Sequence, residues 1–107
     1  MRTQVETSGA PGAIGPYSQG IRAGGLVFTA GQTGADPGTG TLADGVAAQA
    51  DRALRNLTAI LDAAGVALDR VVKTTIFLTD MDDFAAVNEV YATHFSAPYP
   101  ARPSAAP

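Results

Sequence analysis

The sequence contains no cysteine, no tryptophan and a single histidine, His94. Without cysteine the chain can form no disulfide and offers no thiol nucleophile. One histidine cannot supply the paired imidazoles of a His-based zinc centre, a Cys–His dyad or a paired-histidine nuclease site within one chain. A Ser–His–Asp triad would need His94 with Ser18 or Ser96, and neither serine lies in a nucleophile-elbow motif. We therefore expect His94 to be a surface residue near a helix C-terminus.

Basic residues and long apolar runs are also scarce. Seven Lys and Arg stand against ten Asp and Glu, for a net charge of −3, and the basic residues are scattered. A nucleic-acid surface needs clustered Lys and Arg, so we expect no nucleic-acid partner. No apolar run approaches the roughly 20 residues of a membrane-spanning helix, and the N-terminus lacks a signal-peptide core. The sequence thus predicts a cytoplasmic protein without a membrane partner, and its 107 residues fit one domain with a thin core.

Residues 17–32 form the most informative stretch and predict a β-hairpin. Gly24 and Gly25 separate two short runs, and a Gly-Gly pair can adopt the positive φ angles of a tight turn. The second arm is rich in strand-forming residues and ends at Ala30 and Gly31, where the backbone can approach another group. Together with Tyr17 at the start of the first arm, this open backbone suits a small-ligand site.

The flanking N-terminal segments are expected to be an edge strand and two loops. Residues 2–7 alternate weakly, as an edge strand does. Residues 8–16 are rich in Gly and Pro, and Ile14 is their only large apolar residue, so we expect it to anchor this loop. Residues 33–41 contain an Asp-Pro-Gly turn signature and form the second loop.

Residues 44–64 predict an amphipathic helix that covers a sheet, since apolar residues recur every three or four positions. Asp44 is the expected N-cap, and Gly65 fits the position after the helix end. Asp51 and Arg55 are spaced for an ion pair. The face opposite the apolar stripe carries Asp51, Arg52, Arg55, Asn56 and Asp62.

Residues 70–79 predict the strongest strand, with both faces partly apolar. Helices can cover one face. The other face, which carries Lys73 and threonines, indicates a subunit interface with polar content.

A second helix is expected after residue 80, with Asp80 or Asp82 as its cap. Pro98 and Pro100 exclude a helix beyond them, and residues 101–107 show no helix or strand pattern. The inner stripe of this second helix is expected to be Phe84, Val87 or Asn88, Tyr91 and Phe95.

The order strand, hairpin, helix, strand, helix predicts an α/β (α+β) sandwich, with a mixed sheet and two helices on one face. Three polar residues remain as candidates for function, although composition alone gives each an ordinary structural role. Asn88 would be a buried amide bonded to backbone groups. Tyr17 would be a packing residue, and Arg102 would belong to a solvated terminus.

Several separate motifs, in order and with matching spacing, resemble the RidA family, also called the YjgF family or, in older naming, the L-PSP endoribonuclease family. They are Ile14-Gly-Pro-Tyr-Ser-Gln19, Leu26-Val-Phe-Thr-Ala-Gly-Gln32, Val72-Lys-Thr-Thr-Ile-Phe-Leu-Thr-Asp-Met-Asp-Asp-Phe84, Asn88-Glu-Val-Tyr91 and Pro100-Ala-Arg102.

The resemblance implies a chorismate-mutase-like homotrimer, with the sheets facing inward and clefts between subunits. It also implies a deaminase that hydrolyses 2-iminopropanoate and 2-iminobutanoate to 2-oxo acids and ammonia without a cofactor or metal.

The family's site residues correspond to particular positions in this sequence. Arg102 matches the arginine that holds the substrate carboxylate, and Tyr17 matches the cleft tyrosine. Gly31 matches the backbone beside the ligand, and Asn88 matches the amide of a family motif. Ala30 stands at a substrate-binding position where members often carry Ser, so one hydrogen bond would be lost. A planar guanidinium can bind a carboxylate through two hydrogen bonds, which suits Arg102 to this role.

The sequence departs from the family after Arg102. Members continue with further strands and a Glu often assigned to water activation, whereas this sequence reads Pro103-Ser-Ala-Ala-Pro107 there. We therefore expect Arg102 to lie on a flexible tail and deamination to be slower than in a full-length relative. The alternative is a non-catalytic or impaired protein of this fold that binds small carboxylates or protein partners. The older ribonuclease function is disfavoured by the negative charge and the single histidine.

Overall fold

In the computed structural model, which describes residues 1–106, two α-helices and several short strands follow one another along the chain. The α+β class predicted from the sequence is confirmed. Instead of one mixed sheet, however, the strands form an antiparallel sheet of order β1-β2-β3 and a parallel pair, β4-β5. The elements are β1 (Arg2–Val5), β2 (Gly20–Ala23), β3 (Leu26–Thr29), α1 (Val46–Ala63), β4 (Ile76–Phe77), α2 (Phe84–His94) and β5 (Ser104–Ala105).

The predicted hairpin and edge strand are both confirmed. Ala23 pairs with Leu26 across the turn, where Gly24 takes a φ of 58°, and β1 pairs with β2 at the sheet edge. The expected anchor of the following loop is wrong, because Ile14 is 91% exposed. The buried Gln19 holds the loop instead: its amide donates to the carbonyls of Thr7, Ala10 and Pro11.

The sequence predicted the C-terminal end of helix α1 correctly but not its N-terminal end. The N-cap is Gly45 with a φ of 86°, and no side chain caps this end, so the prediction of Asp44 was wrong. Gly65, with a φ of 75°, follows the helix as predicted. Its N–H donates to Asp62 O and the next N–H donates to Leu61 O, a Schellman arrangement that satisfies the terminal carbonyls.

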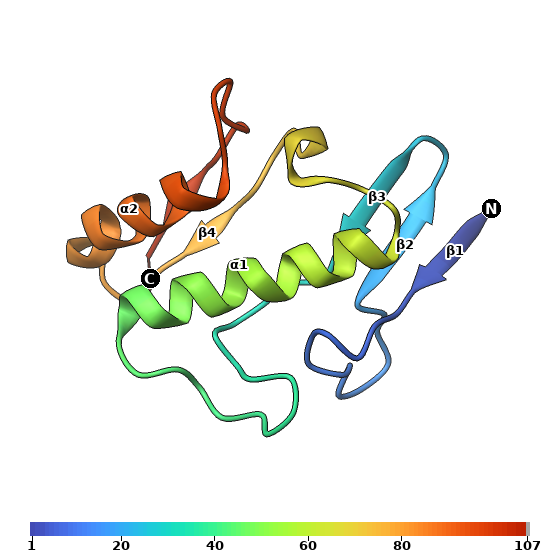
Figure 1. The fold of residues 1–107 in the computed structure, drawn as a ribbon, viewed down its shortest axis with the longest axis horizontal. Helices are drawn as coiled ribbons and strands as arrows, with labels where there is room; N and C mark the ends of the chain where they lie inside the picture. Colours follow the sequence, from blue (N-terminus) through green and yellow to red (C-terminus); the bar gives the residue numbers. More distant parts are fainter. Residues whose placement is uncertain (107) are drawn as a thin grey trace.

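Helix α1 runs across the molecule (Figure 1), and different parts of it contribute to two apolar clusters. Towards its C-terminal end, Ile60 and Ala64 pack with β1 and with Val27 of β3. The second cluster joins Leu54 to α2 and the β4 segment. Its buried members are Leu54, Tyr91 and Phe95.

Asn56 was expected on the charged face of α1, but it is fully buried. Its amide donates to the carbonyls of Thr33 and Ala35, and its oxygen accepts from Arg52. The loop after the hairpin is therefore tied to α1 by a side chain that a simple helical pattern assigns to solvent.

The strand predicted over residues 70–79 is present only in part. The chain turns in a 3₁₀ segment, Leu68–Arg70, and β4 is limited to Ile76–Phe77. Both faces carry an apolar residue, as predicted: Ile76 is half-buried, whereas Phe77, on the face assigned to a subunit interface, is 81% exposed within this chain.

Ser104 and Ala105 form strand β5, which corrects the prediction that the segment after Arg102 has no strand. β5 lies parallel to β4, and the N–H groups of Thr74, Ile76 and Leu78 donate to the carbonyls of Ala101, Pro103 and Ala105. Pro103 lacks an N–H but supplies a carbonyl, and proline is tolerated in such an edge strand. Pro107 lies outside the described residues.

Helix α2 begins after a 3₁₀ turn, Met81–Asp83, whose N-cap Asp80 accepts from the Asp82 N–H at 2.9 Å. Asp80 thus caps the turn that leads into the helix. The predicted inner stripe is confirmed, since Val87, Tyr91 and Phe95 are buried. Across residues 1–106, neither helix is long and apolar enough to cross a membrane.

Candidate active site

The Arg102 side chain lies against one face of α2. Its guanidinium carbon is 4.6 Å from the ring centroid of Tyr91 and 5.4 Å from that of Phe84. One terminal nitrogen donates to the side-chain oxygen of Asn88. A guanidinium over an aromatic face is attracted by the negative potential of the ring. The structure thus brings together Arg102 and Asn88, and holds the arginine in a defined orientation.

The spacing of these α2 residues explains their arrangement. Phe84, Asn88 and Tyr91 follow one another at four and three positions, so they share one face of the helix. The Tyr91 ring stacks on Phe95 with 4.5 Å between centroids, and its hydroxyl is 2.8 Å from the Thr74 hydroxyl. Sequence reasoning assigned Phe84 and Tyr91 only to the core. Their position on the same helix face as Asn88 was the signal that could have identified them.

This geometry corrects two predictions made from the sequence. The amide oxygen of Asn88 accepts a hydrogen bond from Arg102, a side chain rather than the backbone. Arg102 is half-buried beside a paired strand and does not belong to a free tail.

The other candidate residues lie around the hairpin. Tyr17 is 52% exposed, and its hydroxyl accepts from the Ile14 N–H at 3.2 Å. The Ala30 N–H donates to Gln19 O at 2.8 Å. A Cβ placed on Gly31 would meet no atom within 4 Å, so open space lies beside this backbone.

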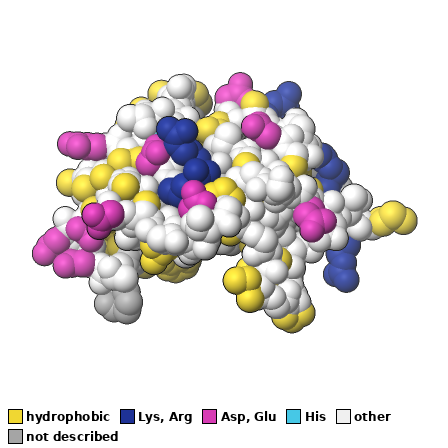
Figure 2. Space-filling view, turned by 60° about the horizontal axis from the view of Figure 1, so that its bottom comes forward, with side chains coloured by type: hydrophobic (Ala, Val, Ile, Leu, Met, Phe, Trp, Pro, Cys, Tyr) yellow, Lys and Arg dark blue, Asp and Glu magenta, His cyan; other side chains and the backbone are white. Residues whose placement is uncertain are grey.

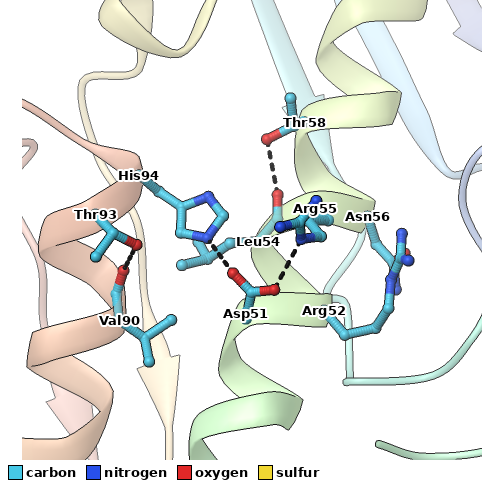
Figure 3. A network of polar contacts seen from close by, with 9 residues as sticks. All are labelled: Asp51, Arg52, Leu54, Arg55, Asn56, Thr58, Val90, Thr93 and His94. Carbon is cyan, nitrogen blue, oxygen red and sulfur yellow. Dashed lines mark hydrogen bonds and ion pairs between the residues drawn. The ribbon is translucent and has the colours of Figure 1, made fainter.

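A separate polar network joins the two helices (Figure 3). Asp51 of α1 accepts from Arg55 at 2.7 Å, as predicted, and its other oxygen is 2.8 Å from Nε2 of His94. The hydrogen bond from Arg55, followed by that from His94, holds the pKa of the Asp51 carboxyl below its usual value. The prediction of a surface histidine is wrong, because the His94 side chain is only 14% exposed.

This network does not extend to a serine. Within residues 1–106, no hydrogen bond joins His94 to Ser18 or Ser96. On the face drawn in Figure 2, a small central group of basic side chains is flanked by acidic ones, and the other basic side chains lie apart from it towards one edge. No group of three His, Asp or Glu side chains in the described part of the chain could hold a metal ion.

Comparison with known proteins gives the family. The family model described as endoribonuclease L-PSP matches residues 7–106. The chain belongs to this family.

Members with similar sequences carry two kinds of name. A RutC family protein of Sinorhizobium fredii is 52% identical over 103 residues, which are 95% of this chain and 82% of the relative. The 2-iminobutanoate/2-iminopropanoate deaminase of Salmonella typhimurium is 47% identical over 105 residues, with 95% and 82% covered. The crystal structure of Escherichia coli TdcF with bound serine superposes with a TM-score of 0.93 at 43% identity, covering 98% of this chain and 85% of TdcF.

The candidate residues of this L-PSP family member fall into two groups within one chain. Tyr17, Ala30 and Gly31 flank the hairpin, which packs near the C-terminal end of α1 (Figure 1). Asn88 and Arg102 belong to the α2 and β5 region, at the other end of that helix. Among residues 1–106, no hydrogen bond links the two groups.

Proposed function

We propose that this chain hydrolyses 2-iminopropanoate and 2-iminobutanoate to the corresponding 2-oxo acids and ammonia. Water adds its oxygen to the imine carbon, the carbon–nitrogen bond breaks, and the nitrogen leaves as ammonia with the protons it has gained. An imine is already electrophilic, so a positioned water and proton transfer can suffice without a cofactor.

The observation that carries the proposal is the arrangement around Arg102. A guanidinium has five N–H donors, and the bond to Asn88 uses one of them. The fork geometry of the remaining donors matches a carboxylate, which every 2-imino acid carries. The rings of Tyr91 and Phe84 cover the guanidinium face, which leaves its edge to bind a carboxylate.

The relatives support the same chemistry. The Salmonella typhimurium protein is named a deaminase of these two imines. Escherichia coli TdcF binds serine, a molecule of similar size with an α-carboxylate. A site built around one arginine would hold either compound by the same group.

We further propose that the complete site lies between subunits of a cytoplasmic homotrimer. Two separated groups of candidate residues in one chain suit a ring in which different surfaces of neighbouring subunits meet. Exposed apolar side chains are available for such contacts, with Phe77 at 81% and Leu26 and Phe28 at 57% exposure. Their burial would remove apolar surface from water and stabilise the assembly.

An imine-hydrolysis assay tests the proposal. An amino-acid oxidase generates the imine, semicarbazide traps it, and an active deaminase lowers the semicarbazone signal. We expect the wild-type chain to lower this signal and Arg102→Ala to leave it unchanged. A wild-type chain that binds 2-oxobutanoate but leaves the signal unchanged would instead favour the non-catalytic alternative.

A further inference from the structure

Tyr91 is a buried residue of α2, and its ring contacts three parts of the fold at once. It is 5% exposed, stacks on Phe95 and receives the Arg102 guanidinium at 4.6 Å. Its hydroxyl is 2.8 Å from the Thr74 hydroxyl, in the segment that leads into β4. The ring is thus fixed by stacking on one side and by a hydrogen bond at its tip.

Phe84 lies at the other end of the same helix face, and its ring centroid is 5.4 Å from the guanidinium carbon. Asn88 stands between the two aromatic residues in sequence and accepts the Arg102 hydrogen bond. The arginine is therefore enclosed by three side chains of one rigid helix, although it is carried by a different segment of the chain.

We propose that Tyr91 and Phe84 are positioning residues, whose rings hold the Arg102 guanidinium ready for the substrate carboxylate. The inference rests on the proposed function, since it assumes that Arg102 binds that carboxylate. An arginine has many rotamers, and a ligand that must first immobilise the side chain loses affinity. Rings that already fix the guanidinium plane remove that loss, although neither ring needs to touch the substrate.

The contacts of Tyr91 exceed what core packing requires. An aliphatic residue at position 91 could fill space beside Phe95 and Leu54, the other buried members of its cluster. It would offer no aromatic face to a cation and no hydroxyl to Thr74. The ring face therefore serves Arg102, and stacking on Phe95 holds that face in place.

Calorimetric titration with 2-oxobutanoate, the product of the proposed reaction, tests the inference on the full chain. We expect Tyr91→Leu to raise the dissociation constant about two- to tenfold, the range expected for immobilising one such side chain. Tyr91→Phe retains the ring and should keep the wild-type affinity to within about twofold.

Leu54→Ala is the matched control. Leu54 belongs to the same buried cluster as Tyr91, so its truncation should lower stability while leaving 2-oxobutanoate affinity unchanged. If Tyr91→Leu fails to fold, the half-buried Phe84→Leu replaces it, with a rise in dissociation constant expected in the same range.

The NMR signal of the Arg102 Nε–H group gives a second readout. Ring currents from Tyr91 should shift this signal upfield in the wild type, and the shift should vanish in Tyr91→Leu but persist in Leu54→Ala. Folded Tyr91→Leu or Phe84→Leu with wild-type affinity would overturn the inference. If Arg102→Ala itself binds as the wild type does, the role of Arg102 in the proposed function fails, which is a separate result.

Discussion

The Arg102 guanidinium is oriented by one hydrogen bond to Asn88 and by two aromatic rings. A hydrogen bond to a charged group contributes about 1.5–3 kcal/mol, so loss of the fork should weaken carboxylate binding about tenfold or more. We expect Arg102→Ala to show this loss for 2-oxobutanoate in calorimetry. Arg102→Lys should not restore affinity, because an ammonium lacks the planar fork. Equal affinities in the wild type and Arg102→Ala would contradict the role of this arginine.

Asp51 belongs to the ion-pair network between the helices, and its pKa is lowered first by Arg55 and then by His94. A carboxyl with a lowered pKa stabilises the fold above its unfolded value of 3.8, and this contribution is lost as the pH falls through the folded-state pKa. At neutral pH we expect Asp51→Asn to lower the free energy of unfolding by about 0.2–1 kcal/mol, the range for exposed pairs.

The same comparison in acid tests the direction in which the Asp51 contribution to stability changes with pH. As the pH falls below 3.8 and then through the lower folded-state pKa of Asp51, urea unfolding of the wild type and of Asp51→Asn should converge, because the wild-type carboxyl is then neutral in both states. Asp44→Asn, at an exposed residue outside the network, is the control and should follow the wild type throughout. A difference for Asp51→Asn that persists unchanged in acid would contradict this account.

At the scale of elements, the ends of α1 depend on single glycines. Gly65 follows the helix with a φ of 75°, where a side chain costs about 1–2 kcal/mol. We expect Gly65→Ala to lower the unfolding free energy by about that amount in urea. Gly12→Ala is the control, since a Cβ on Gly12 would meet no atom within 4 Å and its φ lies outside the positive range. Equal losses in the two variants would show that the backbone angle is not the cause.

The elements that sequence reasoning predicted correctly depend on neighbours in the chain. The stripe of α2 repeats every three or four residues, and the hairpin turn needs two adjacent glycines, so both patterns are local. β5 was missed because its partner lies far back in the sequence, and pairing through the carbonyl of Pro103 leaves no local signal. Asn56 was misplaced for a similar reason, since its bonded carbonyls lie 23 and 21 positions back, in the loop that precedes α1.

The candidate site likewise contains features that the sequence predicts and others that depend on distant contacts. Arg102, Asn88, Tyr17 and Gly31 were chosen through family motifs, which carry information that periodicity does not. Helical spacing places Phe84 and Tyr91 on the face of α2 that carries Asn88, but their contact with Arg102 also required the position of β5 beside α2. A family motif identifies the residue type at one position, whereas the contacts of that side chain depend on how distant parts of the chain come together.

At the scale of the whole molecule, we expect the exposed apolar face around β4 to form a contact between subunits. Phe77 is 81% exposed on the face turned away from the helices, where large apolar side chains favour contact with another subunit. We expect sedimentation equilibrium to give three times the chain mass of 10.8 kDa. Phe77→Asp should shift the chain towards the monomer, whereas Tyr99→Asp, at a loop residue with 55% exposure, should leave the trimer intact. A wild-type monomer at micromolar concentration would contradict the assembly.

A trimer of this kind makes the two residue groups testable by subunit mixing. Arg102→Ala disables the group of candidate residues at α2 and β5 in its own subunit. Tyr17→Ala disables the group beside the hairpin. Each homotrimer should be inactive in the imine assay. If a site joins Arg102 of one subunit to Tyr17 of the next, a mixed trimer contains interfaces where both residues are intact.

With equal amounts and free exchange, about one quarter of the interfaces should combine an intact Arg102 with an intact Tyr17, because the ring contacts are directional. The mixture should then regain roughly that fraction of wild-type activity, whereas mixing either variant with itself should regain none. Native mass spectrometry of tagged chains verifies that the subunits have exchanged. Mixed trimers without activity would mean that the two groups do not meet across subunits, because a site within one chain carries one of the two substitutions in every subunit.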